Sequence, residues 1–173
     1  KVIVLDNFKQ GSMDRLEEAQ KSGKLEIVKG DIRDKKIVEN YMKKVDVVFH
    51  LATQGVRVSL GNPWLVHEVN ASGSLILYES AFKSKIERFI HVSSSEVYGT
   101  AIKIPMREDH PLNPETIYGA SKLVGEMYGM AYFRTHNFPV IVIRPFNTYG
   151  PRSHFSGPYG EVIPRMTIRA LNN

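Results

Sequence analysis

Short apolar runs recur along the chain and predict buried strands. They contain few polar residues and do not alternate with them, which is typical of strands in a parallel sheet that is covered on both faces. In the third run only Asp46 and His50 interrupt the apolar pattern. The predicted strands are residues 1–5, 24–29, 45–52, 88–92 and 140–143.

Segments with apolar side chains at helical spacing lie between these runs. The clearest contains Leu65, Val69 and Ile76, which share one face of a helix. The predicted helices are residues 13–21, 35–44, 63–82 and 117–136. Alternating strands and helices predict an α/β fold with a doubly wound, Rossmann-like parallel sheet, whose ligands bind beyond the carboxyl ends of the strands.

The composition narrows the functional classes. A chain of 173 residues, 42% of them hydrophobic, is long enough for one globular domain, and no run of 18 apolar residues predicts a membrane span. Cysteine is absent, which excludes disulfides and thiolate chemistry and is compatible with a cytoplasmic location. The net charge of +5 is interleaved with acidic residues, so it favours a small anionic ligand over nucleic acid. The six histidines have no paired ligand spacing on one helix, so no metal is expected.

Polar and small residues at three predicted strand ends indicate a dinucleotide site. Asp6 closes the first strand, where a carboxylate binds both hydroxyls of an adenosine ribose and repels a 2′-phosphate, which favours NAD over NADP. A turn cap is the alternative role for Asp6, and an ordinary turn is the alternative for 30–32. The residues predicted to line the site are Asp6, Asn7, Asp31, Ile32, Leu51, Ala52 and Thr53.

The glycine-rich phosphate loop of such a site does not occur in the chain, and the strand that should precede it belongs in the middle of the sheet. We therefore expect a fragment that lacks the first strand. Residues 1–152 are expected to form a partial NAD-binding domain. Expressed alone, these 173 residues are expected to lack tight NAD binding and cooperative unfolding.

A tyrosine and a lysine at the start of the last predicted helix are candidate catalytic residues. Tyr118 and Lys122 are four residues apart and share a helix face, so their head groups can reach one site. An ammonium beside a phenol favours the phenolate, which would make Tyr118 a general base. Ser94, just after the fourth strand, could pass a proton toward Tyr118, although a serine cluster at a strand end also caps turns.

Three motifs in this order resemble the extended short-chain dehydrogenase/reductase family of NAD-dependent nucleotide-sugar epimerases and dehydratases. They are Ser-Ser-Ser-Glu-Val-Tyr-Gly at 93–99, Tyr-Gly-Ala-Ser-Lys at 118–122 and Arg-Pro-Phe-Asn-Thr-Tyr-Gly-Pro-Arg at 144–152. Asn70 matches the structural asparagine that this family carries on its fourth helix. The likeness covers nearly the whole chain. It implies that residues 1–152 carry the catalytic residues, that residues 153–173 are the start of the nucleotide-sugar-binding region, and that most of the C-terminal substrate domain is missing.

The resemblance implies functional roles for residues across the chain. It implies catalysis by Ser94, Tyr118 and Lys122, with Glu96 as a further candidate. Cofactor contacts are implied for Tyr118, Lys122 and Pro145, in addition to the strand-end residues. It also implies a homodimer that packs residues 63–82 and 117–136 into a four-helix bundle. The residues implied to contact the nucleotide sugar are Ser94, Ser95, Glu96, Tyr118, Asn147 and Val162.

The family's members share oxidation of the sugar at C4 and differ in the step that follows. Dehydratases of the family carry an Asp-Glu pair where this chain has Ser95 and Glu96. A Ser-Glu pair at these positions resembles nucleotide-glucuronate decarboxylases and some aminosugar dehydratases, although an epimerase needs little beyond the catalytic trio. We expect a UDP-hexose or UDP-hexuronate 4-epimerase, with a 4,6-dehydratase or a UDP-glucuronate decarboxylase as the alternative. Residues 51–59 resemble epimerases of glucuronate-type sugars, and Glu96 could also serve only as a turn cap. A non-catalytic NAD-binding sensor is a different class, but such proteins usually lose the tyrosine or the lysine.

Overall fold

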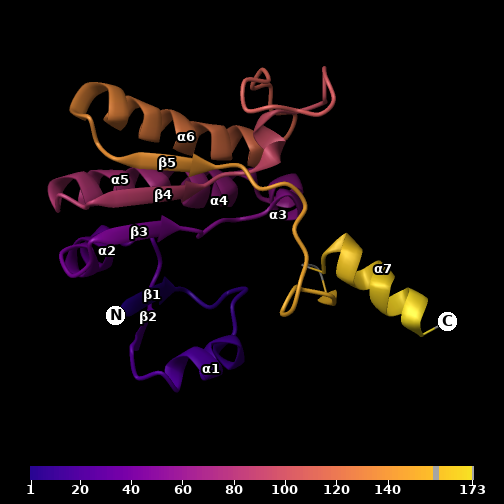
Figure 1. Ribbon diagram of the computed structural model, residues 1–173, viewed down its shortest axis with the longest axis horizontal. Coiled ribbons are helices and arrows are strands. Elements are labelled where there is room, and N and C mark those ends of the chain that lie inside the picture. The colour runs from indigo at the N-terminus through magenta and orange to yellow at the C-terminus, as the bar shows by residue number, and fades with distance from the viewer. Residues whose placement is uncertain (158–159, 173) are drawn as a thin grey trace.

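The computed structural model describes residues 1–157 and 160–172. Its strands form two parallel sheets, and each strand lies within two residues of its predicted start (Figure 1). In one sheet β1 (Val2–Asp6) pairs with β2 (Leu25–Lys29). The other has the order β3 (Val47–His50), β4 (Arg88–Val92) and β5 (Val140–Ile143). The predicted α/β class with parallel strands is confirmed.

The helices follow the predicted segments closely in most places. The predicted helix 117–136 is observed with those bounds, whereas the segment 63–82 contains a π-helical turn at its centre. Three elements have no counterpart in the prediction: α3, the 3-10 turn η3 and α7. The helical elements are η1 (Met13–Leu16), α1 (Glu17–Gln20), α2 (Lys35–Met42), α3 (Val56–Gly61), α4 (Pro63–His67), the π turn η2 (Glu68–Ser72), α5 (Gly73–Lys83), η3 (Ser95–Val97), α6 (Ile117–His136) and α7 (Val162–Leu171).

The hydrophobic core lies between the three-stranded sheet and the layer formed by α2, α5 and α6. Tyr78 of α5 stacks on Phe89 of β4, with ring centroids 4.4 Å apart, and both side chains are fully buried. The prediction that the strands are covered on both faces is wrong for β3 and β5. Their burial alternates, and Phe49 is 64% exposed, because the helices packed against these strands cover only one face.

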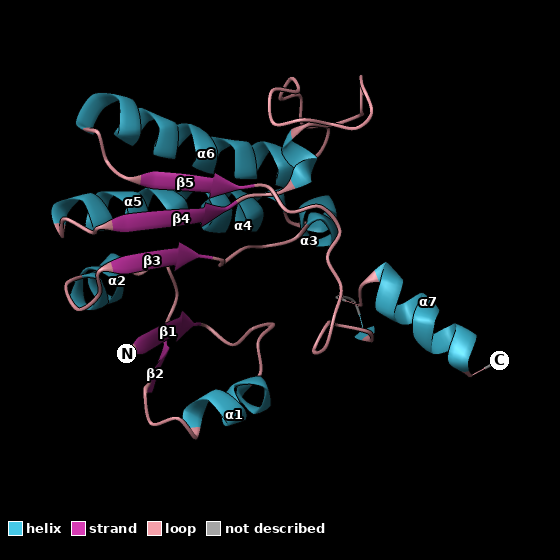
Figure 2. Cartoon of the chain, in the orientation of Figure 1, coloured by secondary structure: helices cyan, strands magenta, loops and turns pink. Residues whose placement is uncertain are grey.

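A cavity separates the two sheets, which lie apart in Figure 2. It has a volume of about 980 Å3 and is lined by β1 on one side and β3 on the other. The separation agrees with the expected strand order, in which a further strand lies between them. The predicted cofactor residues at the carboxyl ends of β1, β2 and β3 all line this cavity.

None of the helices in residues 1–157 and 160–172 is both long enough and apolar enough to cross a membrane.

Candidate active site

The predicted catalytic serine lies in a tight turn directly after β4. Ser94 is the N-cap of η3, and its Oγ accepts a hydrogen bond from the backbone N–H of Glu96 at 3.2 Å. Ser94 therefore does cap the turn after β4, the alternative role that the sequence indicated for it. It leaves the Ser94 hydroxyl hydrogen free to be donated elsewhere, because a hydroxyl can accept and donate together.

The N-terminus of α6 packs directly against this turn. Thr116 caps the helix, accepting from the N–H of Gly119 at 2.9 Å, and its hydroxyl donates to a carboxylate oxygen of Glu96 at 3.3 Å. Gly119 is required for this approach, since a Cβ there would lie 2.7 Å from the carbonyl oxygen of Glu96. The close contact brings Tyr118 beside Ser94.

Tyr118 is half-buried, and its environment acts on the phenol in opposing directions. Burial raises its pKa most, while side-chain hydrogen bonds with Ser94 and Thr53 lower the pKa. The negative charges of Glu96 and Glu161 raise it further. The structure thus joins the predicted pair of Ser94 and Tyr118, and it adds Thr53, which the sequence placed on the cofactor side only.

Lys122 is the second residue of the predicted pair on α6. Its side chain is 2% exposed and runs inward to β4, where Nζ donates to the backbone carbonyl of Val92 at 2.6 Å. Burial lowers the pKa of Lys122 to about 8, and the nearby carboxylate of Glu126 opposes this shift. Lys122 and Ser94 are thus held at the same end of β4.

A buried ion pair, which sequence reasoning missed, ties α6 to β5. Glu126 is 1% exposed and binds the guanidinium of Arg144 through both carboxylate oxygens, with the shortest contact at 2.7 Å. Arg144 also donates to the hydroxyl of Tyr98 at 3.0 Å. Tyr98 belongs to the serine motif, and Arg144 begins the loop that carries Asn147. The only sign of the Glu126–Arg144 pair in the sequence is that Glu126 lies one helical turn after Lys122.

Asn70 lies in the π turn η2 and holds the loop after β3. Its side chain accepts from the backbone N–H of Gln54 at 2.8 Å and donates to the carbonyl of the same residue at 2.9 Å. It also donates to Ser121 on α6 at 3.0 Å and accepts from Thr53. A π turn inside a helix often marks a functional site, and here it directs an amide toward the loop that carries Thr53.

Asp6 faces the cavity between the sheets, and its carboxylate also caps a turn. One carboxylate oxygen accepts from the N–H of Phe8 at 2.6 Å. A Cβ added at Gly11 would come within 3.4 Å of both carboxylate oxygens, so the glycine keeps the space beside Asp6 open. An open carboxylate at the end of a cavity fits the vicinal hydroxyls of a ribose, so these residues fit the adenosine end of NAD.

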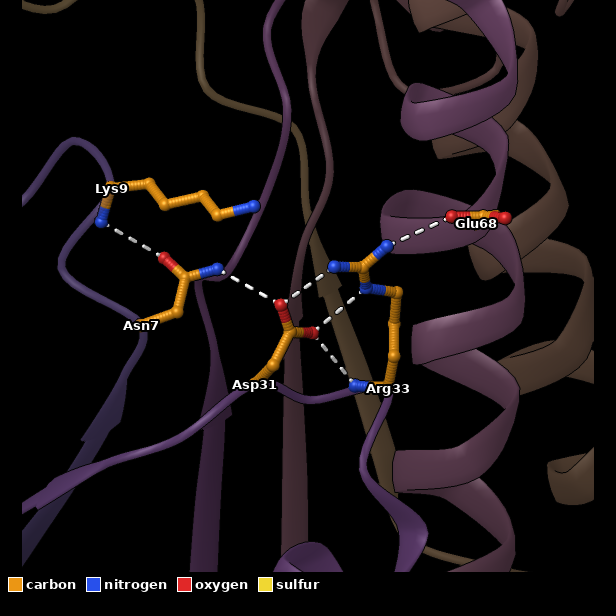
Figure 3. Close-up of polar contacts among 5 residues, drawn as sticks. All are labelled: Asn7, Lys9, Asp31, Arg33 and Glu68. Carbon is orange, nitrogen blue, oxygen red and sulfur yellow. Dashed lines mark hydrogen bonds and ion pairs between the residues drawn. The ribbon is translucent and has the colours of Figure 1, made fainter.

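A polar network beside Asp6 joins the loops after β1 and β2 to the π turn η2 (Figure 3). Asp31 accepts from Asn7 at 3.0 Å and from Arg33 through Nε and Nη2, both at 2.9 Å. Arg33 also donates to Glu68 of η2 at 2.8 Å. Hydrogen bonds from Arg33 hold the pKa of Asp31 well below its usual range, so this carboxylate stays ionised. The network fixes the loop after β2 against the helical layer.

The remaining predicted residues lie in three places. Ile32, Leu51 and Ala52 line the cavity between the sheets. The carbonyl of Pro145 instead accepts from the N–H of Ser95 at 3.0 Å, which places it against the serine turn. Val162 begins α7 and is 65% exposed, and it does not line either cavity described here.

A second pocket, of about 480 Å3, opens beside the serine turn. Ser95, Glu96 and Asn147, all predicted to contact the substrate, line it, and so does Glu115. Glu96 therefore presents its carboxylate to the pocket and does not cap the turn with it, since its partner is the Thr116 hydroxyl.

Two of the histidines lie in the core. His50 and His91 are buried with ring centroids 5.1 Å apart, and burial lowers the pKa of both, that of His91 to about 3. In the described part of the chain no three histidine, aspartate or glutamate side chains are grouped as a metal would require.

Comparisons with known proteins agree with this geometry. The family model described as "NAD dependent epimerase/dehydratase family" matches residues 1–173. A UDP-glucose 4-epimerase of Mycolicibacterium smegmatis is 37% identical over 92% of this chain and 51% of its own. A dTDP-glucose 4,6-dehydratase of an Actinoplanes species is 35% identical over 99% of this chain and 53% of its own.

Solved structures are also similar to this chain. The dTDP-glucose 4,6-dehydratase DesIV of Streptomyces venezuelae, solved with NAD bound, has a TM-score of 0.91 and 32% identity, covering 99% of this chain and 53% of its own. The chain spans about half the length of the curated relatives it matches.

Proposed function

Because the chain belongs to the NAD-dependent epimerase/dehydratase family, we propose that it carries the catalytic residues of a nucleotide-sugar 4-epimerase that works through a transient 4-keto sugar. The observation that carries the proposal is the close packing of the N-terminus of α6 against the serine turn, where Thr116 donates to Glu96 and Gly119 lies against the Glu96 carbonyl, so that Tyr118 lies beside Ser94. Thr53, which interacts with Tyr118, lines the cavity that fits NAD, and Ser95 and Glu96, which follow Ser94, line the pocket beside the serine turn.

Tyr118 is the proposed acid and base of the reaction. NAD, when bound, would supply the acceptor and later the donor of the C4 hydride. Tyr118 removes the proton from the C4 hydroxyl, and the hydrogen bonds from Ser94 and Thr53 stabilise the phenolate that results. Lys122, charged at neutral pH, adds a positive charge one helical turn away. Ser94 holds the reacting oxygen next to Tyr118.

Most of the proposed cofactor residues line the cavity between the sheets, and three of the proposed substrate residues line the pocket beside the serine turn. Residues 1–152 form the proposed NAD-binding and catalytic part, and the residues proposed to hold NAD are Asp6, Asn7, Asp31, Ile32, Leu51, Ala52, Thr53 and Pro145. Residues 153–173 begin the proposed nucleotide-sugar part. Ser95, Glu96 and Asn147 are proposed to contact the sugar, and backbone near Val162 the diphosphate. Arg57 supports this segment by donating to the carbonyl of Gly160 at 2.9 Å.

A 4,6-dehydratase or a UDP-glucuronate decarboxylase is the second candidate. One observation favours it: Glu96 presents a carboxylate to the substrate pocket, where an elimination would need a base. Against it, Ser95 stands where an acid would accompany that base, and epimerisation needs neither group. The sensor alternative is disfavoured because Tyr118, Lys122 and Ser94 are all retained.

A cytoplasmic homodimer is the proposed form. Trp64, Leu75, Met127 and Phe133 are apolar side chains on α4, α5 and α6 that are 76%, 40%, 46% and 48% exposed. Such residues favour burial against a second copy of the same helices. Analytical ultracentrifugation of the full-length protein tests this: a monomer at micromolar concentration would exclude it.

The proposed activity is tested with the full-length protein, NAD and a panel of nucleotide sugars, following the products by proton NMR. A C4 epimer of unchanged mass supports the epimerase, whereas loss of water or carbon dioxide establishes the second candidate and gives Glu96 a catalytic role. The Tyr118→Phe variant should lose turnover by at least about 100-fold and keep its NAD affinity. Unchanged turnover would exclude Tyr118 as the base.

A further inference from the structure

A hydrogen bond joins the two loops that border the cavity between the sheets. Gln10, in the loop after β1, donates from Nε2 to Oε1 of Gln54, in the loop after β3, at 3.1 Å. Both residues line the cavity. The bond therefore connects one sheet to the other across the opening that separates them.

Both ends of this bond come from loops that are ordered by bonds of their own. Gln54 is 7% exposed, and the Asn70 side chain binds its backbone N–H at 2.8 Å and its carbonyl at 2.9 Å. The loop that carries Gln10 is fixed where it leaves β1, because Asp6 accepts from the N–H of Phe8 at 2.6 Å. The two amides are thus held in position for a ligand.

The bond lies between the two ends of the proposed cofactor site. Gln10 is four residues after Asp6, which is proposed to bind the adenosine ribose. Gln54 directly follows Thr53, which interacts with Tyr118, the residue proposed to act where the hydride is transferred. The diphosphate of NAD joins its adenosine half to its nicotinamide half. A dinucleotide that spans the site therefore passes its diphosphate between these two loops.

The chemistry of the lining suits amide donors at this place. Among the described residues that line the cavity, the lysines are Lys1 and Lys44, which precede β1 and β3 and so lie at the opposite ends of these strands. A glutamine amide can donate through both of its N–H groups. The bond to Gln54 occupies a single N–H of Gln10, so each amide nitrogen keeps an N–H for a phosphate oxygen.

Resting on the proposed NAD site, we infer that Gln10 and Gln54 form a clasp that closes over the diphosphate of NAD and retains the cofactor. The clasp depends on the bond between the two amides, because that bond joins the loops. It differs from two separate contacts with the cofactor, since the loss of either partner opens the whole clasp.

The rate of cofactor release tests the clasp. The full-length protein is loaded with NADH, and release into excess NAD is followed by the fluorescence of the bound nicotinamide. Gln10→Leu and Gln54→Leu remove the bond, and each should raise the release rate by at least about 5-fold, the effect of one hydrogen bond. The matched control is Gln20→Leu, an exposed residue of α1 outside the cavity, which should release NADH at the wild-type rate. Rates for both single variants within about 2-fold of the wild type would overturn the inference.

The double variant separates a clasp from two independent contacts. If the bond between Gln10 and Gln54 closes the site, the second substitution adds little, and the double variant should release NADH less than about 10-fold faster than the wild type. Independent contacts multiply instead, to about 25-fold, and that result would overturn the clasp.

Adenosine locates the clasp, because it has the ribose hydroxyls and no phosphate. In calorimetric titrations of the full-length protein, Gln54→Leu should bind adenosine as the wild type does and bind ADP-ribose at least about 5-fold more weakly. An equal loss of affinity for both ligands would show that the substitution disturbs the ribose end of the site, and it would remove the diphosphate from the inference.

The proposed function fails by a different result. If the variants release NADH as expected and the NMR panel shows no C4 chemistry, the clasp stands and the epimerase does not. If the wild type forms a C4 epimer and the variants release NADH at its rate, the proposed reaction stands and the clasp is wrong.

Discussion

Replacing Gly119 with alanine should separate catalysis from stability. The new Cβ would lie 2.7 Å from the carbonyl oxygen of Glu96, whereas ordinary contacts begin near 3.4 Å. The serine turn must therefore retreat from α6 by about 0.7 Å, and Ser94 moves with it. Since a 1 Å displacement can reduce a rate by about 100-fold, we expect kcat to fall by roughly 10- to 100-fold.

The stability of the variant should change much less. Alanine is favoured over glycine inside a helix by about 1 kcal/mol, which offsets part of the steric cost. The assay is kcat for C4 epimerisation by the full-length protein, with the thermal midpoint measured in parallel. The control is Gly61→Ala in α3, where an added Cβ meets nothing within 4 Å. A kcat for Gly119→Ala within about 3-fold of the wild type would refute the argument that close packing aligns Ser94 with Tyr118.

Three further predictions concern the supports of the site. Asn70→Ala should lower the free energy of unfolding by about 2–4 kcal/mol in denaturant titrations, because the backbone N–H and carbonyl of Gln54 lose their partners. Glu126→Ala should cost about 3–5 kcal/mol, since it leaves Arg144 without its buried counter-charge; a loss under 1 kcal/mol would contradict this. The folded pKa of Lys122, about 8, lies below its unfolded value, so the unfolded chain binds more protons and the thermal midpoint should rise as pH increases above 8, a trend that Lys122→Met should flatten.

The sequence predicts α6 to the residue because local chemistry marks both of its ends. Thr116 supplies an N-cap, and Asn137 ends the helix in the left-handed conformation that asparagine tolerates, two residues before a proline. The sequence could not predict the π turn around Asn70, since its bonds to Gln54 and Ser121 form only once α6 has packed against α4 and η2. Nor does helical spacing mark α3, whose apolar residues are too few to show a period.

The motif spacing predicts which residues meet but not every partner. Ser94 and Tyr118 are brought together as the three motifs indicate. Spacing on one helix face predicts that the head groups of Lys122 and Tyr118 share one site, but it does not predict the bond from the Lys122 ammonium to the carbonyl of Val92 on β4. The pairing of Glu126 with Arg144 is likewise a tertiary contact, and no local pattern reports which strand end will face a given helical turn.

The cavity between β1 and β3 leads to a last prediction about the 173-residue chain itself. The facing edges of these strands have no partner strand in the described sheets, and Val4 and Val48 line an opening of about 980 Å3, far larger than the voids of a native core. Residues 1–173 expressed alone should therefore unfold gradually in calorimetry and bind NAD more weakly than micromolar, while the full-length protein shows a sharp transition. A single sharp transition of the short chain with micromolar NAD affinity would show that its two sheets need nothing between them.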